Sequence, residues 1–121
     1  MIPDGDPTRP REEFVAQTIQ FVGEQDGPPE RELKSHLAKL LTSERTVHRA
    51  YLARVQYDDA TNWDVALCLA STDPDVQGLN GRIGRLFAGI FRRDAHLDIL
   101  FLSKTQEAEI SKVCTPFYRE K

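Results

Sequence analysis

The chain has 121 residues and a mass of 13.8 kDa, and 40% of its residues are apolar and 29% charged, as is usual for a single globular domain. Sixteen basic residues against nineteen acidic ones give a formal net charge of −3 at pH 7. This balance gives no general electrostatic reason to bind nucleic acid or an anionic membrane, so neither is expected as a partner.

The beginning of the sequence and the cysteines indicate a compartment. The opening residues, MIPDGDPTRPREE, have neither a basic start nor an apolar stretch, and no apolar run is long enough to span a bilayer. Cys68 and Cys114 belong to no CxxC motif or Cys/His cluster, so we expect buried free thiols in a reducing compartment. The sequence therefore predicts a cytoplasmic protein without a cofactor.

Composition also divides the chain. Residues 1–13 contain three of the seven prolines together with several charges, and such a segment cannot bury enough apolar surface to order itself. We predict a disordered N-terminal tail over residues 1–13 and a single domain over residues 14–121.

The first predicted elements are a strand and a helix. Residues 18–24, TIQFVGE, alternate polar and apolar residues and predict a short strand; a helix over EEFVAQTIQFVG, with Phe14, Thr18 and Val22 on one face, is the alternative. The loop GEQDGPPE follows. Residues 29–44 predict an amphipathic helix with Pro29 near its first turn. Its apolar stripe consists of Leu33, Leu37, Leu40 and Leu41.

The middle of the chain predicts two strands and a second helix. Strands over residues 47–57 and 63–69 flank the polar loop DDATN. In the second strand, Ala66 and Cys68 lie opposite larger apolar residues, which is typical of a central strand covered on both faces. Residues 73–93 predict an amphipathic helix. Its stripe consists of Val76, Leu79, Ile83, Leu86, Phe87 and Ile90.

The last elements complete the fold prediction. Residues 96–103, HLDILFLS, predict a strand, and residues 103–114 a short helix with Ser103 and Gln106 at capping-box spacing, which Pro116 ends. The order β-α-β-β-α-β-α predicts an α+β, ferredoxin-like antiparallel sheet with two helices on one face. In that fold the first and third strands are central and the second and fourth lie at the edges. The short C-terminal helix, with Phe117 and Tyr118, is expected to cover exposed sheet.

The end of the chain carries a family resemblance. LDILFLS, a polar helix and a closing PFYRE resemble the end of the C-terminal domain of the SseB family, the enhanced serine sensitivity proteins. FVGEQDGPPERELKSHLAKLL and RAYLARVQYDDATNWDVALCLA are similar to earlier parts of that domain, so the resemblance covers about residues 18–119. Full-length members carry another domain before this one. The resemblance implies a bacterial protein linked to serine tolerance, and it implies no established reaction, cofactor or catalytic residue.

Two groups of residues are candidate sites. Arg82, Arg85, Arg92 and Arg93 fall on or just after the second predicted helix. They form either a solvated helix face or a patch that docks an acidic protein surface. The other group, Gly23, Glu24, Asp26 and Gly27, lies in the loop after the first strand. ACT domains, which sense amino acids, use such a loop at a dimer interface, a likeness of topology alone.

Other reactive side chains have plainer interpretations. His36, His48 and His96 are not at metal-ligand spacing. Asp98 is expected at the start of its strand, bonded to an arginine such as Arg92 or Arg93, with ligand binding as the alternative. Cys114 is expected to be a packing residue rather than a nucleophile.

Two functional hypotheses remain. The first is a non-catalytic protein-interaction or adaptor domain, with another protein as partner and self-association through a strand edge as a further option. The alternative is an ACT-like domain that senses a small ligand. An enzyme would require Asp98 or Cys114 in a pocket with a hydrogen-bonded base.

Overall fold

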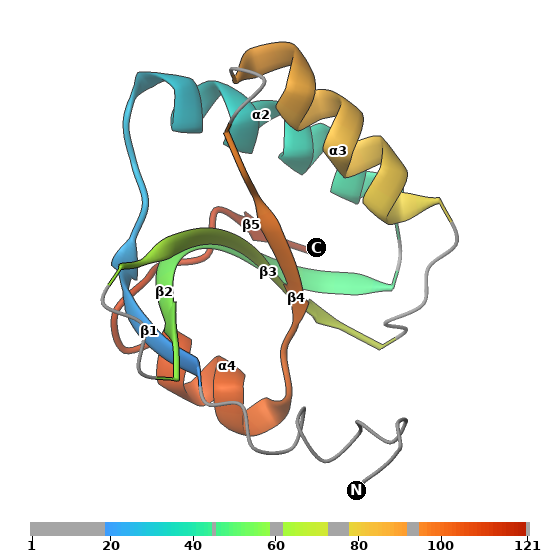
Figure 1. The fold of residues 1–121 in the computed structure, drawn as a ribbon. Helices are drawn as coiled ribbons and strands as arrows, with labels where there is room; N and C mark the ends of the chain where they lie inside the picture. Colours follow the sequence, from blue (N-terminus) through green and yellow to red (C-terminus); the bar gives the residue numbers. More distant parts are fainter. Residues whose placement is uncertain (1–18, 45, 59–61, 73–77, 92–94, 121) are drawn as a thin grey trace, which may run out of the picture.

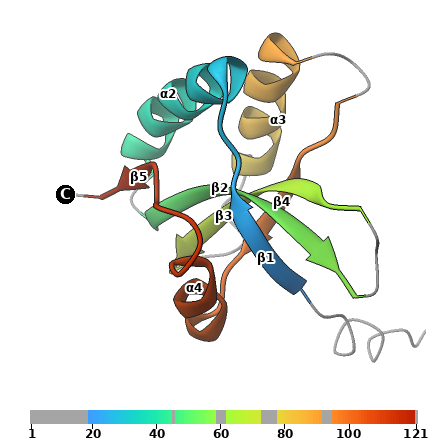
Figure 2. The same ribbon diagram turned by 90° about the vertical axis from the view of Figure 1, so that its left-hand side faces the viewer.

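The computed structural model describes residues 19–44, 46–58, 62–72, 78–91 and 95–120 (Figure 1). The predicted tail, residues 1–13, lies outside this part. In chain order the elements are β1 (Ile19–Glu24), α2 (Pro28–Thr42), β2 (Val47–Tyr57), β3 (Asp64–Ser71), α3 (Leu79–Ile90), β4 (Asp98–Phe101), α4 (Lys104–Ile110) and β5 (Tyr118–Arg119). The predicted α+β class is confirmed: α2 and α3 cover one face of a sheet and α4 the other (Figure 2).

The strand order differs from the ferredoxin-like prediction. The strands follow the order β1-β2-β3-β4, and β5 pairs with β2 beside β1. β1–β2 and β2–β3 are antiparallel, whereas β3 and β4 are parallel and joined by the crossover helix α3. The ferredoxin-like prediction is therefore wrong in two respects. The central strands are β2 and β3 rather than the first and the third, and the β3–β4 pair is parallel rather than antiparallel. Alternating side chains specify the face that each residue occupies, but not the neighbouring strand.

One hydrophobic core lies between the sheet and α2 and α3. Leu33, Leu37 and Leu41 of α2 are at most 1% exposed, which confirms the helix predicted from leucine spacing. We call this set the helix-side core. It consists of Leu33, Leu37, Leu41, Val47, Ala50, Leu52, Leu67, Leu69, Leu79 and Ile83.

Helix α3 begins later than predicted. Gly78 precedes it with φ of 79°, a left-handed conformation that glycine adopts without steric cost, and the helix starts at Leu79. Leu79 and Ile83 of the predicted stripe are fully buried, whereas Val76 lies outside the described residues. The apolar period was therefore predicted correctly over the described helix.

The opposite face of the sheet carries a second core. This α4-side core consists of Phe21, Tyr51, Ala53, Val55, Ala66, Cys68, Ile110 and Cys114. Because residues of β3 enter both cores, its prediction as a central strand covered on both faces is confirmed. Helix α4 ends at Ile110, and the Cys114 N–H donates to the Ile110 carbonyl at 2.9 Å. Pro116 thus lies beyond the helix and does not end it.

The C-terminus is docked on β2. The Phe117 N–H donates to the Ala50 carbonyl at 2.9 Å, and the Glu120 N–H donates to the His48 carbonyl at 2.8 Å. Phe117 and Tyr118 pack against the helix-side core, so they and α4 serve different faces of the sheet. The sequence predicted the docking, but not the short strand β5 that forms it.

The predicted capping box of α4 provides a test of local stability. The Gln106 N–H donates to Ser103 Oγ at 3.1 Å, and the Ser103 N–H donates to Gln106 Oε1 at 2.9 Å. Ser103→Ala should therefore lower the free energy of unfolding by about 1 kcal/mol, measured by urea denaturation. Thr105→Ala, at an exposed position of the same helix, is the control. An unchanged midpoint for Ser103→Ala would contradict the cap.

Candidate functional site

Two of the predicted docking residues line a groove between α2 and α3. The groove has a volume of about 360 Å³, and the two helices lie side by side on the same face of the sheet (Figure 1). Its lining residues are His36, Leu40, Arg82, Arg85 and Leu86. The groove thus joins apolar surface from two leucines to the charge of two arginines, which suits an acidic and partly apolar chain segment.

Arg82 is held in place within the chain. Its Nη2 donates to Glu44 Oε2 at 2.6 Å, and the Glu44 side chain is 17% exposed. Arg82 Nε is buried and has no hydrogen-bond partner in the described structure. Glu44 therefore balances part of the Arg82 charge and orients its guanidinium.

Among the described residues of the groove, Arg85 is the cation without an ion-pair partner. It is exposed and makes no ion pair with another described residue. A Cβ added to Gly81 would lie 3.7 Å from Arg85 Nη1, so the guanidinium lies close to the backbone one turn earlier. Arg92 and Arg93 lie outside the described residues, so only half of the predicted four-arginine patch is placed.

The predicted ligand loop makes contacts within the chain. Glu24 accepts hydrogen bonds from Lys34 Nζ at 3.3 Å and from the Thr115 N–H at 3.3 Å. Asp26 accepts from Arg31 Nη2 at 3.2 Å and from Lys34 Nζ at 3.4 Å, and the Arg31 bond is the main cause of a lowered pKa at Asp26. These carboxylates tie the end of β1 to α2 and to the C-terminal segment.

The loop glycines also have close neighbours. A Cβ at Gly23 would lie 2.9 Å from Arg54 Nη2, and a Cβ at Gly27 would lie 2.5 Å from Glu30 Oε1. Small residues at both positions therefore leave room for neighbouring side chains. Amino-acid binding by this loop stays a prediction.

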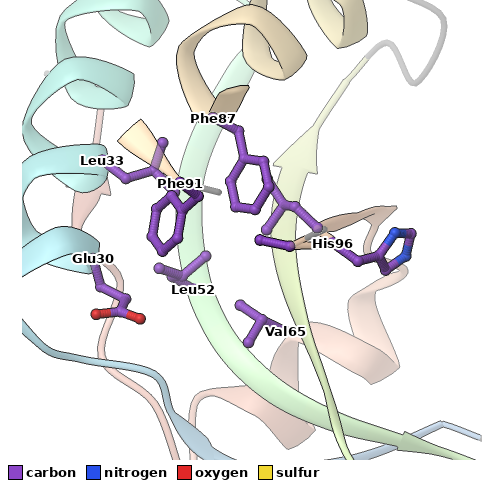
Figure 3. Close-up of a pocket in the computed structure, with 9 residues that line it drawn as sticks. Glu30, Leu33, Leu52, Val65, Phe87, Phe91 and His96 are labelled. Carbon is purple, nitrogen blue, oxygen red and sulfur yellow. The ribbon is translucent and has the colours of Figure 1, made fainter. Parts of the chain in front are cut away.

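A separate cavity lies where α2 begins and α3 ends (Figure 3). It holds about 120 Å³ of space that water-sized molecules can enter. Its lining residues are Glu30, Leu33, Leu52, Val65, Phe87, Phe91, Ala95, His96 and Leu97. The Phe87 and Phe91 rings are stacked, with centroids 4.6 Å apart and planes 12° apart. The sequence did not predict this cavity, because its walls come from segments far apart in the chain.

Asp98 begins β4, as predicted, and has partners other than those expected. Its carboxylate accepts a hydrogen bond from Tyr57 Oη at 2.7 Å and contacts His96 Nε2. Burial, followed by this bond, raises the pKa of Tyr57. The expected partners, Arg92 and Arg93, lie outside the described residues. No hydroxyl or thiol side chain of the described part lines the cavity beside His96.

The histidines are each close to a different acid. The pairs are His36 with Glu32 at 3.9 Å, His48 with Glu120, and His96 with Asp98. Within the described ranges, no group of three or more His, Cys, Asp and Glu side chains is arranged to hold a metal ion.

Both cysteines are free and buried, as predicted. Burial is the main cause that raises the pKa of Cys68 to about 12 and that of Cys114 to about 11. The Cys114 thiol lies near backbone oxygens, donating to the Leu52 carbonyl at 3.5 Å. These thiols are therefore protonated at neutral pH, which favours packing over a nucleophilic role.

Thiol labelling tests this assignment. At pH 8 both cysteines of the native domain should react with a disulfide reagent at least about tenfold more slowly than in urea, because the thiolate is scarce and access is blocked. The rate is followed by the absorbance of the released thiol, with free cysteine as the control. Rapid labelling of Cys114 in the native domain would restore it as a candidate nucleophile.

Comparison with known families identifies the family of this chain. A family model described as "SseB protein C-terminal domain" matches residues 15–120. The chain belongs to this family. The match extends over every strand and helix of the described structure, and it confirms the resemblance seen at PFYRE and in the earlier segments. No curated protein and no solved structure matches this SseB domain. In the described part of the domain, none of the helices has the length and apolar character needed to cross a membrane.

The SseB domain also contains a polar network that the sequence did not predict. Arg49 binds both carboxylate oxygens of Glu107, with Nη2 at 3.0 Å from Oε1, and Tyr51 Oη donates to Oε2 at 2.8 Å. With Lys104, Ala108 and Ser111 these side chains line a shallow depression on the α4 side of the domain. Since Glu107 already has internal partners, the network attaches α4 to β2. No local pattern pointed to it, because β2 and α4 are distant in the sequence.

Proposed function

We propose that this SseB domain is a non-catalytic protein-interaction domain of the bacterial cytoplasm, which binds an acidic segment of another protein in the groove between α2 and α3. The link to serine tolerance implied by the family belongs to the same proposal. The observation that carries it is Arg85, an exposed cation beside the apolar side chains of Leu40 and Leu86. Arginine beside apolar surface is enriched where binding energy concentrates in protein interfaces.

The fixed position of Arg82 supports the same function. Its hydrogen bond to Glu44 at 2.6 Å orients the guanidinium before a partner arrives, which reduces the entropy lost on binding. Arg82 and Arg85 on α3 face His36 and Leu40 of α2 across the groove. An extended or helical segment with acidic and apolar residues would pair its charges with the arginines and bury its apolar side chains on the leucines.

Affinity capture from a bacterial extract tests this proposal. Proteins retained by the wild-type domain are compared with those retained by Arg85→Glu. A specific partner should lose at least about tenfold in affinity with the variant, because like charges would then meet. Its binding to the wild type should also weaken at higher salt.

Lys112→Glu is the matched control. Lys112 is exposed just after α4, on the opposite side of the sheet, and its reversal changes the net charge by the same amount. A partner that binds Arg85→Glu as well as the wild type would refute the groove as the docking site. If both variants lost the same affinity for the partner, net charge rather than the groove would explain the binding.

A further inference from the structure

We propose that the cavity at the end of the α2–α3 pair binds a small molecule with a compact apolar body and an amino group at its outer end. This site is separate from the groove, and the inference does not depend on the proposed function. Apart from Glu30 and His96, every side chain of the described residues that line the cavity is apolar (Figure 3). This described lining therefore offers apolar walls with polar groups from two side chains.

The volume of the cavity indicates the size of the apolar part of the ligand. A cavity of about 120 Å³ is several times larger than a water needs, and a water there would find few polar partners. An enclosed apolar cavity of about 150 Å³ takes up benzene, so the space here is close to the size of a single ring. The stacked rings of Phe87 and Phe91 add an aromatic wall, against which a second aromatic ring packs favourably. A single ring or a branched aliphatic group of similar size fits best.

The charged groups around the cavity indicate which polar group the ligand carries. Glu30 Oε2 accepts a hydrogen bond from Gln25 Nε2 at 2.9 Å, and Glu30 makes no ion pair with another described residue. The other polar lining residue, His96, contacts the Asp98 carboxylate. Among the described lining residues the carboxylate is therefore that of Glu30, which favours an ammonium over a carboxylate as the polar end of the ligand.

The arginine closest in the strand register does not reverse this preference. Arg54 lies opposite Val65 of the cavity wall in the β2–β3 pairing. Its guanidinium lies over the Trp63 ring, 5.5 Å from the centroid, and Arg54 does not line the cavity. Among the described residues that line the cavity, a ligand carboxylate would therefore meet the Glu30 carboxylate and no arginine or lysine.

Three probes that share one ring test the site: benzylamine, benzyl alcohol and benzoate. Binding to the full chain is measured by amide and methyl chemical shifts in NMR titrations. Benzylamine should bind most tightly and benzoate least, with the largest shifts at Leu33, Val65 and Leu97. Glu30→Gln should remove the advantage of benzylamine over benzyl alcohol, expected to be about fivefold. Glu32→Gln, at an exposed position of the same helix, should preserve it.

A second experiment fills the cavity with a larger side chain. Val65→Phe should abolish binding of all three probes, and Leu97→Phe serves the same purpose if Val65→Phe does not fold. Arg85→Glu should leave probe binding unchanged, which separates this site from the groove. The proposal is overturned if no probe binds, if benzoate binds as tightly as benzylamine, or if binding survives in a folded, filled variant.

Discussion

Truncation of the chain after Pro116 is expected to lower the free energy of unfolding by about 4 kcal/mol, which is a large part of the roughly 5–15 kcal/mol that stabilises a typical domain. The truncation removes the backbone hydrogen bonds from Phe117 to Ala50 and from Glu120 to His48. It also removes the half-buried rings of Phe117 and Tyr118 from the helix-side core. Urea denaturation followed by far-UV circular dichroism measures the loss.

Single substitutions separate the contributions of this segment. Phe117→Ala should cost about 2 kcal/mol because its ring is half buried, and Tyr118→Phe about 1 kcal/mol because it removes the bond from Tyr118 Oη to the Leu41 carbonyl at 3.1 Å. Arg119→Ala, at an exposed position, should change stability by less than about 0.5 kcal/mol. A truncated chain that unfolds at the wild-type midpoint would contradict docking of the C-terminus in solution.

The docked end illustrates what the sequence could and could not predict. The apolar pair in PFYRE indicated burial, because terminal residues remain ordered only when contacts compensate for their lost entropy. A two-residue strand, however, has no periodicity to recognise. Tyr118–Arg119 forms β5 because the pairing of β1 along β2 ends at Ala53, which leaves the β2 edge near Ala50 open. The unpaired edge of β2 depends on how the strands pack together, and no local sequence pattern encodes it.

The same distinction applies to the rest of the fold. Leucine spacing predicted α2 well, because one helical stripe must face a core, and the S-x-x-Q spacing predicted the cap of α4. The parallel pairing of β3 with β4 was not predictable in this way, since Ala66 and Asp98 become neighbours only after α3 has crossed the sheet. Every backbone offers the same hydrogen-bonding groups, so local patterns leave the strand order open.

The candidate sites were predictable only as residue types. Arg82 and Arg85 stood out in the sequence, but the groove that contains them also needs His36 and Leu40 from another helix. The cavity and the Arg49–Glu107 network likewise combine distant segments. Reactive groups can thus be identified along a chain, whereas concave surfaces come from packing.

The Glu107 carboxylate is the second position where a large effect is expected. Glu107→Ala should destabilise the domain by about 2 kcal/mol at pH 7, since it removes the acceptor of the Arg49 and Tyr51 side chains. The loss should be smaller than for a fully buried ion pair, because the Arg49 side chain is 39% exposed and solvent screens its charge. Glu109→Ala, at an exposed position of α4, is the control and should have little effect.

The pH dependence of this loss tests its electrostatic origin. Hydrogen bonding from Arg49, with a smaller contribution from Tyr51, holds the pKa of Glu107 below its usual value of 4.5. Burial raises the pKa of Tyr51 to about 12, so its hydroxyl remains a donor throughout. A lowered native pKa contributes stability that is fully present above the pKa of the unfolded chain and is lost as pH falls through the native value.

The difference between wild type and Glu107→Ala should therefore be constant from pH 7 to about pH 5 and should shrink as the pH falls below about 4. Urea denaturation at a series of pH values measures this difference, and Arg49→Ala combined with Glu107→Ala gives the coupling energy of the pair. At pH 7 the coupling should account for about half of the Glu107→Ala loss, with Tyr51 responsible for much of the rest. A loss that stays the same down to pH 3 would instead assign the role of Glu107 to packing of its side chain.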